Sequence, residues 1–261
     1  MKIHKIIYSL FIGLMILTVS SCDPIVDGKS LSNTTNVEGV ELVSSQATAG
    51  GNLITLEMVT PGVTGYWDYN IGTALTNKVE IIYPIPGKAT FTFKGTLGAE
   101  FFEKTIDVQI DQLDAPLDQD WYDLVSENTA EGKTWVYAGT GGETGWWYMS
   151  DPNNWSAVWW DAGECCGPWD AAGRMTFDLD GAANFTYESG PGATPEMGSF
   201  VLDVTNQQLQ VNGPNILGAV EGGGNPSGLY NIISLTEDEM ILFVPNAAWA
   251  TGWTYKFKPE E

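Results

Sequence analysis

The residues best suited to chemistry lie in one stretch, residues 146–169, which reads WWYMSDPNNWSAVWWDAGECCGPW. A tryptophan side chain has a large apolar face and one polar N–H, so it suits a surface that is partly apolar and partly wet. Its flat ring can also stack on the apolar face of a sugar, and nearby carboxylates can accept hydrogen bonds from sugar hydroxyls. We therefore predict a carbohydrate-binding surface formed by Trp146, Trp147, Trp155, Trp159, Trp160, Asp161, Glu164 and Trp169.

The alternative is that these indoles fill the core of a β-fold and that the two acids belong to a solvated loop. Neighbouring residues of a strand point to opposite faces. We therefore expect one member of each of the pairs Trp146–Trp147 and Trp159–Trp160 to be buried and the other exposed. The adjacent Cys165 and Cys166 either form a vicinal disulfide, which would stiffen the loop, or stay reduced and buried.

The chain begins like an exported protein. Lys2 and Lys5 precede an apolar run over residues 6–19, which is too short for a membrane span and predicts a signal peptide over residues 1–21. The sequence VSSC at residues 19–22 resembles a bacterial lipobox, which implies cleavage before Cys22 and acylation of its thiol. Two or more acyl chains anchor a protein stably. We expect an outer-membrane lipoprotein that is exposed at the cell surface, with either leaflet as its destination and residues 22–35 as a flexible tether.

The charge of the chain excludes several partners. With Lys2 and Lys5 removed, nine basic residues remain against 33 acidic ones, a formal charge of −24. Such a protein repels nucleic acid and polyanionic glycans, so a neutral polysaccharide or oligosaccharide is the favoured partner.

The residue types also argue against catalysis. The sole histidine, His4, lies in the signal peptide, so mature Ser-His-Asp, Cys-His and His-metal sites are excluded. We expect no enzyme activity, no metal and no cofactor. One catalytic alternative is a glycoside hydrolase with two facing carboxylates. Acids near the indoles that would serve it are Glu143, Asp151, Asp161, Glu164 and Asp170.

Short alternating segments and 30 glycines predict an all-β chain. We expect an immunoglobulin-like sandwich over residues 36–113, a joint near 113–120 and a second β-domain over 121–261. For the second domain we expect an antiparallel sandwich of jelly-roll type, with a lipocalin-like closed barrel as the alternative.

The sequences GYWDYNIG (residues 65–72) and YPIPGKATF (83–91) resemble the PKD domain, although the Gly-Asp part of its turn is altered here. The resemblance implies that Trp67 is a core indole and that this domain is a spacer. GKTWVY (132–137), WWDA (159–162), MTF (175–177) and ISLTEDEM (233–240) resemble the second domain of PKD-containing surface glycan-binding lipoproteins from polysaccharide-utilisation systems.

That family resemblance implies capture of a polysaccharide, with a β-glucan as the expected ligand, and an outer-membrane transporter complex as a further partner. A function from another class also fits the sequence. In it the protein is a structural or assembly lipoprotein whose tryptophans are core packing.

Overall fold

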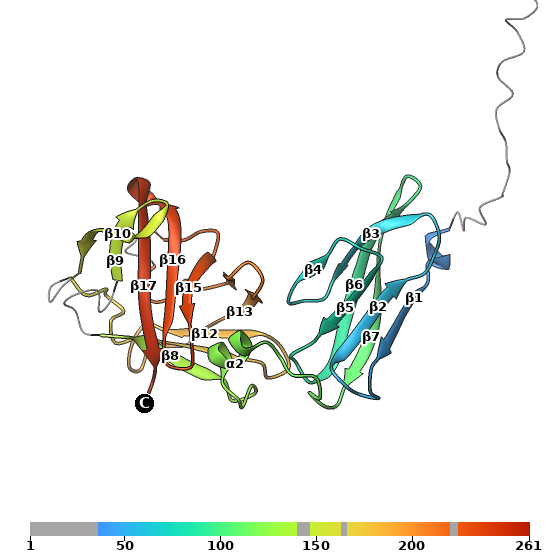
Figure 1. Ribbon diagram of the computed structural model, residues 1–261, viewed down its shortest axis with the longest axis horizontal. Helices are drawn as coiled ribbons and strands as arrows, with labels where there is room; N and C mark the ends of the chain where they lie inside the picture. Colours follow the sequence, from blue (N-terminus) through green and yellow to red (C-terminus); the bar gives the residue numbers. More distant parts are fainter. Residues whose placement is uncertain (1–35, 140–146, 163–165, 220–223) are drawn as a thin grey trace, which may run out of the picture. The chain divides into compact units, whose positions relative to one another are not determined.

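The computed structural model describes residues 36–139, 147–162, 166–219 and 224–261. Residues 35–261 form one compact unit, whose strands belong to three sheets (Figure 1). Among the described residues, no helix has the length and apolar character needed to cross a membrane.

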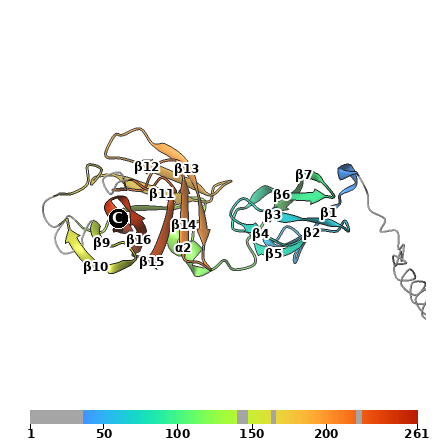
Figure 2. The same ribbon diagram turned by 90° about the horizontal axis from the view of Figure 1, so that it is seen from above.

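Two antiparallel sheets occupy residues 42–110. The first has the strand order β1 (Leu42–Gln46), β2 (Leu53–Met58), β5 (Lys78–Ile82), and a short 3-10 helix, η1 (Val37–Gly39), precedes it. The second has the order β4 (Thr73–Ala74), β3 (Val63–Asp68), β6 (Gly87–Leu97), β7 (Glu100–Ile110). They form two layers (Figure 2), which is a β-sandwich. The more specific relation to PKD domains stays a prediction.

Trp67 lies at the centre of this sandwich, as expected. Its side chain has no exposed surface, and its Nε1 donates a hydrogen bond to the carbonyl of Asn77 over 3.1 Å. The indole meets Phe93 edge-on at 5.3 Å between ring centroids. Its polar atom is therefore satisfied inside the core, and Trp67 is a packing residue.

The remaining strands build a closed barrel. Its eight strands are β8 (Lys133–Tyr137), β11 (Arg174–Asp178), β12 (Asn184–Glu188), β13 (Glu196–Asp203), β14 (Gln208–Asn212), β15 (Leu229–Leu235), β16 (Met240–Ala247) and β17 (Thr251–Pro259). Each pairs antiparallel with the next, and β17 returns to pair with β8 through Phe257 opposite Tyr137.

The expected jelly-roll sandwich of the second half is therefore wrong, and the barrel that we gave as the alternative is present. Alternating strands look the same in both architectures. What separates them is the pairing of the first strand with the last, across more than a hundred residues, and local sequence carries no signal for that pairing.

The interior of the barrel is filled with aromatic side chains. Phe177 packs against Phe185 at 5.0 Å and against Phe200 at 5.3 Å between centroids. The short helix α2 (Gln119–Val125) packs against β8, β11 and β15. It is fixed there by a 3.0 Å hydrogen bond from Nε1 of Trp135 to the carbonyl of Leu124. An eight-stranded barrel has just enough room for such side chains, so its core is solid.

A hairpin interrupts the sequence of barrel strands between β8 and β11. It consists of β9 (Trp147–Asp151) and β10 (Asn154–Asp161), and β9 pairs with the first half of β17 while the end of β17 pairs with β8. The hairpin thus extends the sheet beyond the barrel wall, with β10 as its edge strand. A 3-10 turn, η2 (Ala248–Ala250), connects β16 to β17.

Candidate functional site: an aromatic hairpin on the barrel

The tryptophans divide evenly between core and surface. Of the ten that the structure describes, five are buried: Trp67, Trp121, Trp135, Trp147 and Trp253. The other five are exposed: Trp155 (39 %), Trp159 (55 %), Trp160 (36 %), Trp169 (61 %) and Trp249 (76 %). Three of the exposed five belong to β10. The site is therefore centred on the β9–β10 hairpin.

Trp147 is part of the core, so its prediction as a ligand-contacting residue is wrong. Only 4 % of its surface is exposed, and its ring lies 4.8 Å from Trp253 and 6.4 Å from Tyr255 between centroids. Its Nε1 donates to the carbonyl of Cys166 over 3.3 Å. The indole is enclosed by protein because β9 lies beside β17. Its neighbour Trp146 lies outside the described residues.

Trp160 connects the core to the surface. It pairs with Met149, as Trp253 does on the other side of β9, and paired residues share a face of the sheet. Its ring meets Trp147 at 6.3 Å and Trp253 at 6.2 Å, both edge-on. The buried indoles therefore hold Trp160 in place and leave about a third of it exposed.

Trp159 and Trp160 are both exposed, so the expected alternation fails for this pair. The reason is the irregular register of β10. Shifts occur between Asn154 and Val158 and again between Val158 and Trp160. A bulge inserts extra residues into one strand and breaks the simple alternation of faces.

The outer part of β10 is an exposed apolar edge. Trp155 and Trp159 lie there with Val158, which is 44 % exposed. Soluble proteins normally protect edge strands with charge, proline or covering segments, because bare edges pair with other chains. An edge that carries large apolar side chains is typical of a binding surface.

Trp169 is held on a turn that Asp170 anchors. Asp170 is fully buried, and its carboxylate accepts hydrogen bonds from the Tyr187 hydroxyl at 2.9 Å and from the Gly218 amide at 3.0 Å. Burial raises the pKa of Asp170 above its ordinary value, against the opposing effect of these hydrogen bonds. Trp169 beside it keeps 61 % of its surface exposed. Asp170 is thus a structural acid.

The other predicted residues fall into two groups. Asp161 is half-buried at the end of β10 opposite Tyr148, and Cys166 is disulfide-bonded with a left-handed backbone (φ 71°). Cys22, Glu143, Glu164 and Cys165 lie outside the described residues, as do the predicted signal peptide and tether. The predicted vicinal disulfide and the role of Glu164 therefore stay predictions.

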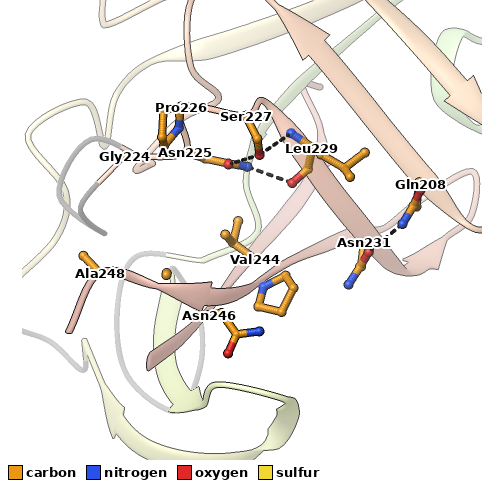
Figure 3. A pocket seen from close by; sticks show the side chains of 12 residues that line it. Gln208, Gly224, Asn225, Pro226, Ser227, Leu229, Asn231, Val244, Asn246 and Ala248 are labelled. Atoms are coloured by element: carbon orange, nitrogen blue, oxygen red, sulfur yellow. Dashed lines mark hydrogen bonds between the residues drawn. The ribbon is translucent and has the colours of Figure 1, made fainter. Parts of the chain in front are cut away.

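Sequence reasoning missed Trp249 and a pocket next to it in the chain, which Figure 3 shows. Trp249 lies far from the dense tryptophan stretch, with only Trp253 near it in the sequence. Its backbone is left-handed (φ 60°), a conformation that no sequence pattern predicts for tryptophan.

No protein-family model matches the sequence, and neither does any curated protein.

Proposed function

We propose that this protein is an outer-membrane surface lipoprotein that binds a neutral polysaccharide through exposed tryptophans and does not cleave it. The observation that carries the proposal is the group of exposed indoles on β10 and on the Trp169 turn. Buried aromatic residues pack against Trp160, and Asp170 anchors the turn that carries Trp169.

Exposure of these side chains calls for an explanation. Removing apolar surface from water contributes about 25 cal/mol per Å², so the fold leaves stabilising energy unused at each bare indole. Trp155, Trp159 and Trp169 are each more than a third exposed. A ligand that stacks on these rings recovers that energy. Aromatic stacking on nucleic acid bases is worth about 1–3 kcal/mol per ring, and we expect sugar stacking to be no stronger.

The charge of the protein selects the kind of glycan. The mature chain has a formal charge of −24, with nine basic residues against 33 acidic ones, which disfavours sulfated and uronic-acid polymers. A neutral β-glucan is our proposed ligand. The lipobox at residues 19–22 supplies the proposed anchor through Cys22, and residues 22–35 supply the tether.

The test is binding of the lipid-free mature chain to immobilised polysaccharides: β-1,3-glucan, β-1,4-glucan, starch, a polyuronate and a sulfated galactan. We expect retention on at least one neutral glucan and little on the two polyanions at physiological salt. Release of reducing sugar from the bound glucan would point to the glycoside hydrolase alternative. Failure to bind any neutral polymer would favour the structural or assembly role.

A further inference from the structure

A pocket of about 690 Å³ with a mixed polar and apolar lining lies on the barrel (Figure 3). Its size falls in the range of roughly 300–1,000 Å³ that is usual for small-molecule sites. Residues of β14, β15 and the end of β16 line it, together with the turn over residues 224–227. Gln208 and Asn231, which pair across β14 and β15, alternate with the buried Leu209 and Tyr230, so they lie on the outer face of the barrel.

Among the residues that the structure describes, the lining of this pocket carries no ionisable side chain. Its residues are Gln208, Gly224, Asn225, Pro226, Ser227, Leu229, Asn231, Val244, Pro245, Asn246, Ala247 and Ala248. Four of them are carboxamides and one is a hydroxyl. On a chain with 33 acidic residues, a pocket whose described lining is uncharged favours a neutral ligand.

Several polar atoms of the pocket are available to a ligand. Gln208 Nε2 donates to Asn231 Oδ1 over 3.3 Å, and Asn246 Nδ2 donates to Asn153 Oδ1 over 3.2 Å. In the part of the chain that the structure describes, Gln208 Oε1, Asn231 Nδ2 and Asn246 Oδ1 have no hydrogen-bond partner. Two acceptors and a donor around one pocket match the hydroxyl groups of a sugar ring, which both donate and accept.

The pocket is rigidly built on the side of the 224–227 turn. The Asn225 carboxamide donates to the carbonyl of Leu229 over 2.8 Å and accepts from the Ser227 hydroxyl over 2.7 Å. Gly228 has a left-handed backbone (φ 63°), and a side chain there would lie 2.0 Å from the carbonyl oxygen of Val211. The turn is therefore held in one conformation, which lowers the entropic cost of binding.

The opposite wall contains an unusual backbone. Asn246, Trp249 and Ala250 all have positive φ angles, of 49°, 60° and 56°. Non-glycine residues adopt this conformation at a cost, and such residues cluster at functional sites. Ala248 lines the pocket, and Trp249, the next residue, exposes 76 % of its surface. This connection therefore carries an exposed indole directly after a residue that lines the pocket.

We propose that this pocket is a second saccharide site, in which the carboxamides of Gln208, Asn231 and Asn246 bind the hydroxyls of one neutral sugar unit and Trp249 contacts the same glycan. The ligand class rests on the proposed function, whereas the location of the site does not. Asn246 also joins the pocket wall to the turn of the aromatic hairpin, because its amide donates to the carbonyl of Pro152 over 3.0 Å.

The test follows the side-chain amide resonances of the lipid-free mature chain by NMR during titration with cellohexaose, laminarihexaose and maltohexaose. We expect the amides of Gln208, Asn231 and Asn246 to shift with at least one probe. Asn231→Leu removes the polar group at similar volume and should weaken this response roughly 2- to 10-fold, the equivalent of one hydrogen bond. Asn212→Leu is the matched control, because Asn212 is exposed on the neighbouring strand β14 and does not line the pocket.

Comparison with the aromatic hairpin separates the two proposals. If Trp159→Ala abolishes the hexaose response of the hairpin while the pocket amides still shift, the pocket is an independent site, as proposed. Shifts confined to the hairpin indoles would overturn the pocket and leave the hairpin proposal standing. If the pocket amides shift and no hairpin variant weakens binding, the hairpin proposal is overturned and the pocket proposal stands. If none of the hexaoses shifts either set, both proposals fall.

Discussion

Trp147 and Trp159 lie in the same hairpin, and their replacement by alanine should have opposite consequences. Trp147 is 4 % exposed and contacts the rings of Trp253, Tyr255 and Trp160. Truncation of a buried tryptophan costs about 3–5 kcal/mol. For a protein of this size, 1 kcal/mol corresponds to a shift in Tm of about 2–4 °C. Trp147→Ala should therefore lower the Tm by about 6–20 °C.

Trp159 is 55 % exposed on the edge strand, so Trp159→Ala should change the free energy of unfolding by no more than about 0.5 kcal/mol. Its loss should appear in affinity instead. A stacking contribution of about 1–3 kcal/mol corresponds to a roughly 5- to 100-fold weaker Kd. The same should hold for Trp155→Ala. Trp160→Ala should lower both the affinity and the stability of the protein, because Trp160 packs on the buried indoles.

The assay combines a thermal melt with affinity electrophoresis, in gels that contain the neutral glucan to which the wild-type protein binds. The Trp147→Ala variant must be measured well below its own Tm, so that unfolding does not mimic a loss of binding. The reasoning is refuted if Trp159→Ala melts as early as Trp147→Ala, because the exposed indole would then be part of the core. It is equally refuted if Trp155, Trp159 and Trp169 can all be replaced without a change in affinity.

Two further predictions concern the anchor and the buried acid. Cys22→Ala should leave the protein unlipidated and washed from membranes by high salt, and equal retention of variant and wild type would contradict the lipobox prediction. Burial raises the pKa of Asp170 above 3.8, so its contribution to stability is complete below that pH and is lost as pH rises through the raised value. The Tm of Asp170→Asn minus that of wild type should therefore increase between pH 4 and pH 7, and a constant difference would show that Asp170 does not titrate in this range.

Local features of the fold were predictable from the sequence. The dipeptide Asp180-Gly181 between two alternating segments is a hairpin signal, and β11 and β12 pair there with Gly181 at φ 70°. Trp67 was expected in the core from the resemblance to PKD domains, and its side chain is fully buried. Closure of the barrel was not predictable, because it depends on contacts between β8 and β17 at the two ends of the domain.

The candidate site was predictable as a region but not residue by residue. The density of tryptophan at residues 146–169 located the hairpin, yet burial of Trp147 depends on the position of β17, and exposure of Trp160 depends on bulges. The carboxamide pocket unites residues from 208 to 248, none of which forms a motif. Such sites arise from tertiary packing, which one sequence does not reveal.

The filled barrel explains why any ligand site must lie on its outside. Larger or emptier barrels bind small molecules in their interior, but here Trp135, Phe177 and Phe257 have no exposed surface. Segments attached to the wall remain: the β9–β10 hairpin, the Trp169 turn and the connection over residues 246–250. Each carries at least one exposed tryptophan. Aromatic packing and the hydrogen bond between Asn246 and Asn153 hold the hairpin to the barrel, and the hydrogen bonds of Asp170 hold the Trp169 turn. A rigid barrel with exposed tryptophans on these outer segments suits the binding of a long polysaccharide. Such a polymer can lie across an outer surface but cannot enter a closed core.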